Sequence, residues 1–180
     1  MATSPERREQ ALDALNGGTF DAIVVGGGIN GAVSTLALAA HGLRVALVER
    51  HDFASGTSQE SSCMVWGGFK YLESHDLKLV AGLCDSRNRL ARAYPTRLAE
   101  VRFLASLDHG APFPPWFAAL GAVAYWGLGR LATQPPRHRS VTTIGRLEPA
   151  VNTSTVRGGI EYSDYLLVDN DARFVSEMAF

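Results

Sequence analysis

Residues 20–49 read FDAIVVGGGINGAVSTLALAAHGLRVALVE. The apolar, β-branched run at 20–25 predicts a strand buried on both faces of a parallel sheet. Small apolar residues over 29–41 predict a helix that ends at Gly42, and the run at 44–49 predicts a second buried strand. A strand, helix and strand within about 30 residues form a crossover connection. The stretch therefore predicts an α/β fold with a parallel sheet.

Three glycines follow the first predicted strand at the spacing Gly26-x-Gly28-x-x-Gly31. In a dinucleotide-binding turn, Gly26 makes the tight bend, Gly28 lets backbone N–H groups reach a pyrophosphate, and Gly31 lets the helix pack close to the strand. The helix N-terminus at Ile29 and Asn30 offers unpaired N–H donors and partial positive charge to phosphates. The spacing and its position between a strand and a helix together predict a dinucleotide site.

An acid ends the second predicted strand. Glu49 lies 18 residues beyond Gly31, about where a carboxylate hydrogen-bonds the adenosine ribose. A carboxylate there would repel a 2′-phosphate, so NADP is disfavoured. The alternative is a glycine-rich turn in an ordinary α/β sheet with Glu49 on its surface.

The composition excludes several classes of protein. The chain has 180 residues, which is enough for one domain or one and a half. Of these residues 46% are hydrophobic and 19% charged, so the chain can build a core. A net charge of −1 excludes general nucleic-acid binding. Two cysteines cannot form a disulfide framework, and the five histidines have no metal-ligand spacing. The N-terminus lacks the apolar region of a secretory signal, so a cytoplasmic location is expected.

The stretch 56–62, GTSQESS, bears on whether the dinucleotide is NAD or FAD. Its hydroxyl groups could donate hydrogen bonds to the ribityl chain and pyrophosphate of FAD. They could equally belong to a solvated loop whose serines cap a helix. Composition does not separate these alternatives.

The remaining chain predicts further helices and strands. Residues 76–94 predict an amphipathic helix, with Arg87 among the polar residues opposite an apolar face. Residues 101–107 and 158–168 predict strands, and a helix is expected from Asp171 onward. The uncharged span 111–129 predicts a buried helix, because its prolines leave about 15 helical residues and a membrane span needs about 20. Its aromatic residues, followed by arginines, also suit the surface of an anionic bilayer.

A family resemblance adds to these predictions. Residues 20–62 and the segment GGFKYLE at 67–73 closely resemble the N-terminal part of FAD-dependent glycerol-3-phosphate dehydrogenases. These enzymes belong to the FAD-dependent oxidoreductases of the D-amino-acid-oxidase-like class. A looser resemblance extends through AYPTRLAEVRFL, RLEPAV and GGIEYSDYLLVDNDARFV to about residue 178.

The resemblance implies a Rossmann-like FAD-binding βαβ domain with the beginning of an α+β substrate domain. Residues 1–18 would be a polar lead-in, 19–75 the N-terminal part of the FAD-binding domain, and 76–180 helical segments and the start of the substrate domain. In the family, glycerol 3-phosphate gives a hydride to flavin N5, and the electrons pass to quinone. The resemblance also implies possible peripheral contact with the cytoplasmic face of a membrane. Alternatives are an amine or amino-acid oxidase of the same class, or an inactive dinucleotide-binding fragment.

The resemblance assigns roles residue by residue. Lys70 and Tyr71 would face a small-molecule substrate, glycerol 3-phosphate or similar. Cofactor binding falls to Gly26, Gly28, Ile29, Asn30, Gly31, Glu49, Arg50, Thr57, Ser58, Ser61, Ser62, Gly67 and Gly68.

The chain also departs from the family pattern. Where the family reads SSKLIHGGLRY, residues 61–71 read SSCMVWGGFKY. Cys63 removes a cation, Trp66 replaces a histidine, and Lys70 keeps a charge but loses the bidentate fork of arginine. A thioether bond from Cys63 to flavin is conceivable, but a free buried thiol is the favoured interpretation.

The relatives run to several hundred residues, and their catalytic residues lie beyond the position of Phe180. The resemblance therefore predicts an N-terminal fragment that binds FAD poorly and catalyses no turnover by itself.

Overall fold

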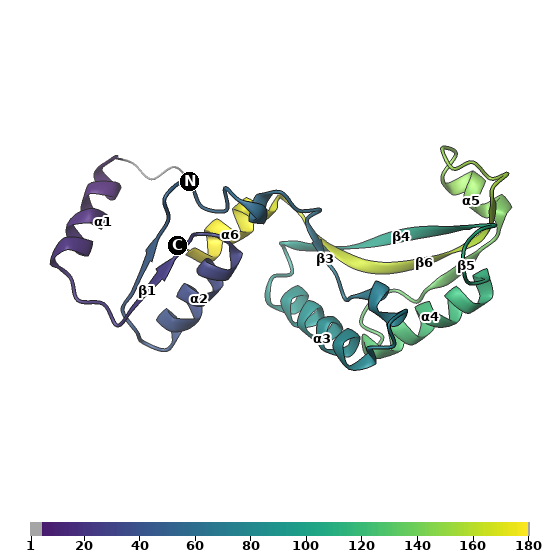
Figure 1. The fold of residues 1–180 in the computed structure, drawn as a ribbon, viewed down its shortest axis with the longest axis horizontal. Helices are drawn as coiled ribbons and strands as arrows, with labels where there is room; N and C mark the ends of the chain where they lie inside the picture. The colour runs from purple at the N-terminus through teal and green to yellow at the C-terminus, as the bar shows by residue number, and fades with distance from the viewer. Residues whose placement is uncertain (1–4, 180) are drawn as a thin grey trace. The chain divides into compact units, whose positions relative to one another are not determined.

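The computed structural model describes residues 5–179, which divide into two compact units. The first unit holds the described residues up to Cys63 together with 169–179, and the second holds 64–168 (Figure 1). The predicted boundaries at 18/19 and 75/76 stay predictions. The lead-in predicted at 1–18 falls partly outside the described residues.

The first unit contains the predicted βαβ connection. Strand β1 pairs in parallel with β2, with Ala22 opposite Val45 and Val25 opposite Val48. Helix α2 packs against both strands, and its buried residue is the small Ala32. This arrangement confirms the Rossmann-like prediction. The elements of the unit are α1 (Pro5–Gly17), β1 (Ala22–Val25), α2 (Ile29–Ala40), β2 (Val45–Val48), η1 (Thr57–Gln59) and α6 (Asp171–Ala179).

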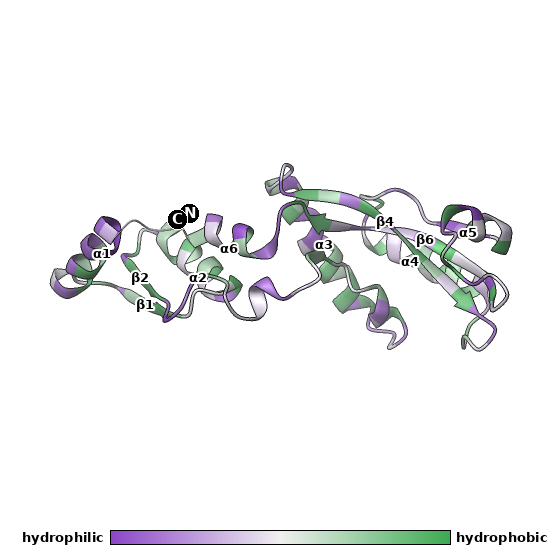
Figure 2. Cartoon of the chain, turned by 90° about the horizontal axis from the view of Figure 1, so that it is seen from above, coloured by the Kyte–Doolittle hydropathy of each residue, from purple (hydrophilic) through white to green (hydrophobic). Residues whose placement is uncertain are grey.

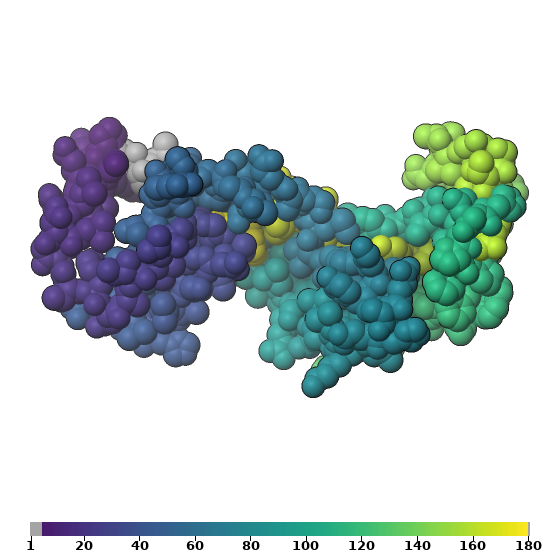
Figure 3. All heavy atoms as spheres, in the orientation of Figure 1, coloured from purple at the N-terminus to yellow at the C-terminus, as the bar shows by residue number. Residues whose placement is uncertain are grey.

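Helix α6 belongs to the first unit although it comes last in the chain. It packs against α2 and against the short 3₁₀ helix η1. In Figure 3 its yellow atoms lie among the blue and purple atoms of the first unit. A helix beginning at Asp171 agrees with the sequence prediction.

The strand predicted to be buried on both faces is exposed on one of them. Ile23 and Val25 of β1 are 66% and 82% exposed, whereas Ala22 and Val24 are half-buried. Alternate side chains of a strand point to opposite faces, so only one set can face α2. Figure 2 colours β1 and β2 at the hydrophobic end of its scale. The prediction of double burial is therefore wrong for the described structure.

The second unit is built around a long strand, β6. It pairs antiparallel with β3, β4 and β5. The β4–β6 ladder runs from Leu98 opposite Leu167 to Asp108 opposite Val156, with an irregularity at its last step. Figure 1 shows α3 and α4 on the same side of this sheet. The elements are β3 (Met64–Val65), η2 (Phe69–Leu72), α3 (Leu77–Ala93), β4 (Leu98–Asp108), α4 (Pro115–Leu128), β5 (Arg137–Arg139), α5 (Val141–Leu147) and β6 (Val156–Leu167).

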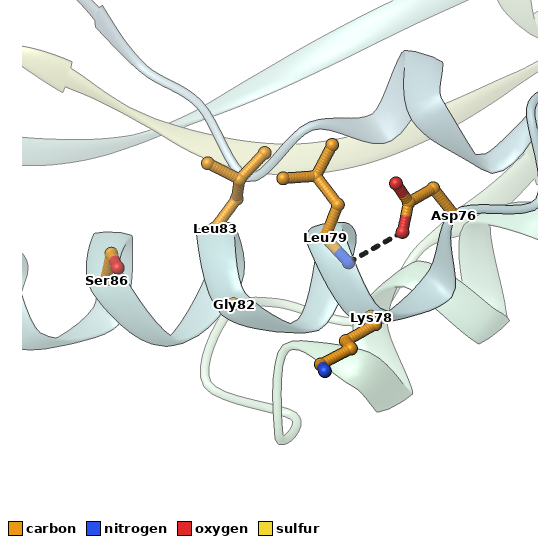
Figure 4. Close-up of a pocket in the computed structure, with 6 residues that line it drawn as sticks. All are labelled: Asp76, Lys78, Leu79, Gly82, Leu83 and Ser86. Atoms are coloured by element: carbon orange, nitrogen blue, oxygen red, sulfur yellow. Dashed lines mark hydrogen bonds between the residues drawn. The ribbon is translucent and has the colours of Figure 1, made fainter.

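Helix α3 confirms the amphipathic helix predicted at 76–94, with one correction. Asp76 is its N-cap and accepts a hydrogen bond from Leu79 N at 3.0 Å (Figure 4). Arg87, expected on the polar face, is buried with Val80 and Cys84. Val80, Cys84 and Arg87 follow one another at intervals of four and three residues, which places them on one helix face.

Helix α4 differs from the buried helix predicted over 111–129. Ala122 and Tyr125 are buried, but Trp116, Leu120 and Val123 are exposed. The prediction of a buried helix is therefore wrong for this outer face. Among residues 5–179, no helix has the length and apolar character needed to cross a membrane.

Candidate functional site

The turn between β1 and α2 requires glycine at two positions. Gly26 has a φ of +106°, and its N–H donates to Val48 O at 2.8 Å, which ties the turn to the end of β2. A Cβ on Gly31 would lie 1.8 Å from Gly26 O. No side chain fits into that space, so the N-terminus of α2 can approach the strand only with glycine at 31.

A serine hydroxyl lies at the N-terminus of α2. Gly28 is the N-cap residue, and it has no side chain to satisfy the first N–H groups. Ser58, in η1, instead accepts a hydrogen bond from Ile29 N at 3.0 Å. A Cβ on Gly28 would lie 3.1 Å from the same hydroxyl. The loop 56–62 thus places a hydroxyl at the positive end of a helix, which is where phosphates bind.

The carboxylate of Glu49 is turned toward the same glycine turn. It accepts hydrogen bonds from Gly27 N at 2.6 Å and from His51 N at 2.8 Å. These two N–H groups lower the pKa of Glu49 below its usual value, with Gly27 as the larger cause. Each carboxylate oxygen has two acceptor positions, so both can still accept a hydroxyl donor.

These residues fit the adenosine and pyrophosphate part of a dinucleotide. The N-cap has no side chain, the helix presents N–H groups, and an ionised carboxylate lies beside the turn. Asn30, Arg50 and Thr57 are exposed near the same elements. The binding role of all of them stays a prediction.

Ser61, to which the resemblance assigns a flavin-lining role that stays a prediction, is hydrogen-bonded within the first unit. Its hydroxyl donates to Asp171 Oδ2 at 2.5 Å and accepts from Cys63 N at 3.0 Å. It therefore links the serine-rich loop to the start of α6. Ser62, next to it, is exposed.

Cys63 is held as a thiol by Asp171. The hydrogen bond to that carboxylate is the largest of the effects that raise the pKa of Cys63. Burial raises the pKa of Asp171, but hydrogen bonds from Cys63 and Ser61 lower it overall. The cysteine predicted to be buried is only partly buried.

The other predicted residues lie in the second unit. Gly67 and Gly68 are buried, and Gly68, with a φ of +84°, precedes η2. Lys70 and Tyr71 belong to η2 and are exposed. The ring of Trp66 lies 5.8 Å from that of Tyr71.

Two other features are less informative about function. A shallow hollow beside α3 contains none of the predicted site residues and is lined by Asp76, Lys78, Leu79, Gly82, Leu83 and Ser86 (Figure 4). No group of three or more potential metal ligands occurs within the described part of the chain.

Sequence reasoning missed a buried group of polar residues beneath Gly67. Arg87, Tyr125 and Asp164 come from α3, α4 and β6. The arginine and the aspartate are 77 positions apart, so no local motif joins them. The position of Arg87 on the same helix face as Val80 was the one available signal.

Comparison with known proteins identifies the family. The model of the FAD dependent oxidoreductase family matches residues 21–179. The chain belongs to this family. It is similar to glycerol-3-phosphate dehydrogenase 2 of Mycobacterium tuberculosis strain H37Rv, with 38% identity over 181 residues, 99% of this chain and 30% of the relative. Members of the family are oxidoreductases, so the chain comes from an enzyme family.

Solved structures of two oxidoreductases have a similar fold. The X-ray structure of glycerol-3-phosphate dehydrogenase from Bacillus halodurans, complexed with FAD, aligns with a TM-score of 0.68 and 22% identity over 96% of this chain and 26% of that chain. Glycine oxidase from Geobacillus kaustophilus aligns with a TM-score of 0.56 and 18% identity over 89% and 43%. The chain spans about 30% of the length of the curated relatives it matches.

Proposed function

We propose that the chain binds FAD and forms part of a flavin-dependent oxidoreductase of the glycerol-3-phosphate dehydrogenase type. The observation that carries this proposal is the turn at Gly26–Gly31. A Cβ on Gly31 would lie only 1.8 Å from Gly26 O, and Glu49 accepts a hydrogen bond from the backbone of the turn. The family and the FAD-bound relative support the choice of FAD as the dinucleotide.

The proposed roles of the residues follow from their chemistry. The N-terminus of α2 binds the pyrophosphate through backbone N–H groups, and the Ser58 hydroxyl gives up Ile29 N when a phosphate oxygen replaces it. Glu49 accepts a ribose hydroxyl and repels a 2′-phosphate. When bound, FAD supplies the acceptor for two electrons from a substrate C–H bond.

A small phosphorylated alcohol is the proposed substrate. Lys70 is exposed beside Tyr71 on η2 and can attract a phosphate as a point charge. It lacks the planar fork with which arginine binds a phosphate through two hydrogen bonds. We therefore expect weaker phosphate binding than in relatives that have arginine at this position.

The first experiment titrates the purified chain with FAD and follows flavin fluorescence. We expect saturable binding of FAD. ADP-ribose should compete with FAD at a concentration at least tenfold lower than its 2′-phosphorylated counterpart needs. Glu49→Gln should reduce this discrimination, because it removes the negative charge. A folded chain that shows no saturable binding up to about 1 mM FAD, which is about −4 kcal/mol, would contradict the proposal.

An amino-acid oxidase of the same class is the second candidate. Lysine in place of a phosphate-binding arginine and the structural similarity to glycine oxidase favour it. Anaerobic mixing of an FAD-loaded full-length relative with glycerol 3-phosphate or with glycine distinguishes the two, because only the true substrate bleaches the flavin. A yellow protein that neither compound bleaches would point to a binding module without turnover.

We also propose that α4 contacts an anionic membrane. Quinone in that membrane would accept the electrons from the flavin. The exposed apolar residues Phe113, Trp116, Phe117, Leu120 and Val123 follow a helical spacing along and just before this helix. Exposed Arg130 and Arg137 follow it in the chain and provide positive charge. Aromatic and basic residues together bind the interface of anionic bilayers.

Vesicle co-sedimentation tests the membrane proposal. The chain should bind vesicles containing phosphatidylserine at low salt and release them at high salt, and Trp116→Gln with Leu120→Gln should weaken binding about tenfold or more. Binding that is equal for neutral and anionic vesicles, or absent from both, would contradict it.

A further inference from the structure

A buried ion pair lies at the centre of the second unit. Arg87 of α3 is 3% exposed and Asp164 of β6 is fully buried. Arg87 Nη1 donates to Asp164 Oδ1 at 2.5 Å. Tyr125 of α4, 2% exposed, donates its hydroxyl to the same carboxylate at 2.9 Å and accepts from Arg87 Nη1 at 3.1 Å. Three separate elements therefore meet at one carboxylate.

Arg87 also donates through its two other nitrogens. Its Nε and Nη2 donate to Asn88 Oδ1 at 3.1 and 3.0 Å. Asn88 in turn donates to Gly129 O at 2.8 Å, just past the end of α4. The guanidinium carbon also lies over the rings of Tyr125 and Tyr165, at 5.5 and 5.9 Å. Both charged groups of the network are thus hydrogen-bonded.

Such a network contributes little net stability. Removing two charges from water costs several kcal/mol for each ion, and apolar residues of equal volume often serve as well or better. The network can instead act by holding the neighbouring backbone in one position.

The neighbouring backbone is that of Gly67. Its N–H donates to Asp164 Oδ1 at 3.2 Å, and its carbonyl accepts from Cys84 Sγ at 3.5 Å. A Cβ at this position would lie 2.2 Å from Tyr125 Oη and 2.9 Å from Arg87 Nη1. The main chain at 67 is therefore pressed against the network and hydrogen-bonded on both of its polar groups.

Residues 68–71 continue directly from this anchored position. Gly68, in the left-handed region, accepts from Tyr71 N at 2.9 Å and starts η2. Phe69 stacks on Tyr162 at 4.5 Å and meets the edge of Tyr125 at 5.2 Å. The inner side of η2 is thereby fixed, while Lys70 stays exposed.

We propose that Arg87, Asp164 and Tyr125 are positioning residues that fix the Gly67–Gly68 backbone and so set the direction in which η2 presents Lys70 and Tyr71. The anchoring of the backbone stands on the contacts above. The use of Lys70 and Tyr71 toward a substrate rests on the proposed function.

Hydrogen–deuterium exchange on the full chain without flavin tests the anchoring. Tyr125→Phe and Asp164→Asn should speed exchange at amides 67–71 about tenfold or more relative to the β4 amides of the same variant. Glu161→Gln is the matched control, because Glu161 is also on β6 and pairs with Arg102 and Arg139 away from Gly67. It should leave amides 67–71 at the parent rate relative to β4.

Several outcomes would overturn the inference. Exchange at 67–71 that rises only in proportion to β4 would mean that the network acts on global stability alone. Equal acceleration by Glu161→Gln would mean that any lost ion pair has this effect. If Asp164→Asn does not fold, Cys84→Ala and Tyr125→Phe still decide. The first removes one hydrogen bond to Gly67, the second removes the hydrogen bonds of one hydroxyl, and both keep the ion pair.

A second measurement separates this inference from the proposed function. In the flavin titration of the purified chain, Tyr125→Phe should leave the FAD affinity within about twofold of the parent, because the network lies in the second unit and the glycine turn in the first. If the chain binds no FAD, the proposed function fails. Hydrogen–deuterium exchange at amides 67–71 still tests the anchoring of the Gly67–Gly68 backbone. If FAD binds normally and amides 67–71 do not change, the inference alone is overturned.

Discussion

At the scale of single residues, the close approach of Gly31 to the carbonyl of Gly26 gives the sharpest prediction. A Cβ at 31 would lie 1.8 Å from that oxygen, so Gly31→Ala must push α2 away from β1. We expect a loss of about 1–3 kcal/mol in the free energy of unfolding, together with weaker FAD binding. Urea denaturation measures the first effect and flavin fluorescence the second.

Gly121→Ala is the control for this substitution. Nothing lies within 4 Å of a Cβ at 121, inside α4, so alanine should be neutral or stabilise by up to about 1 kcal/mol. If Gly31→Ala unfolds at the same urea concentration as the parent chain, the tight approach is not present in solution.

Glu49 gives a prediction of pH dependence. Its pKa is below 4.5 in the folded chain because Gly27 and His51 donate to the carboxylate. A lowered pKa means that these bonds stabilise the turn at all pH values above the unfolded pKa, and that this stabilisation is lost as the pH falls through the folded pKa. The amide shift of Gly27 should therefore titrate with a midpoint below 4.5, and Glu49→Gln should abolish that titration. A midpoint at or above 4.5 would contradict the hydrogen bonds.

The residues of the glycine turn could be identified from sequence because their role is local. Gly26, Gly31 and Glu49 follow a fixed spacing along one βαβ connection. Arg87 and Asp164 could not, since their pairing depends on how α3 packs against β6. An arginine in a charged helix resembles a surface residue until a buried partner is known.

At the scale of elements, the start of α3 depends on one side chain. Asp76 accepts from Leu79 N at 3.0 Å and satisfies a donor that the helix leaves unpaired. Asp76→Ala should cost about 1 kcal/mol in the free energy of unfolding, measured by urea denaturation. Ser86→Ala, exposed further along the same helix, should change it by less than about 0.5 kcal/mol. Equal effects of the two substitutions would rule out capping.

The helices also show where sequence prediction stops. The amphipathic pattern of 76–94 predicts which face of the helix is buried, because charged and apolar residues alternate at the helical period. The uncharged span 111–129 has no such pattern, so its helix could be predicted but its exposed face could not. Which side of α4 meets water is decided by Tyr125 packing toward Asp164, a long-range contact.

At the scale of the whole molecule, the second unit is continuous and contains all the partners of β6. We expect residues 64–168 to fold alone, with circular dichroism and a cooperative urea transition like those of this unit in the full chain. Residues 1–63 alone lack α6, which packs against α2, and should not unfold cooperatively. A disordered 64–168 peptide would show that the unit needs the rest of the chain.

The return of α6 to the first unit has a consequence during protein synthesis. The ribosome releases α2 early, but its packing partner follows only after all of 64–168 has been translated. The opening βαβ segment must therefore remain without the packing partner of α2 on the nascent chain while the later unit folds. Over that interval the surface of α2 that α6 later covers is open to water.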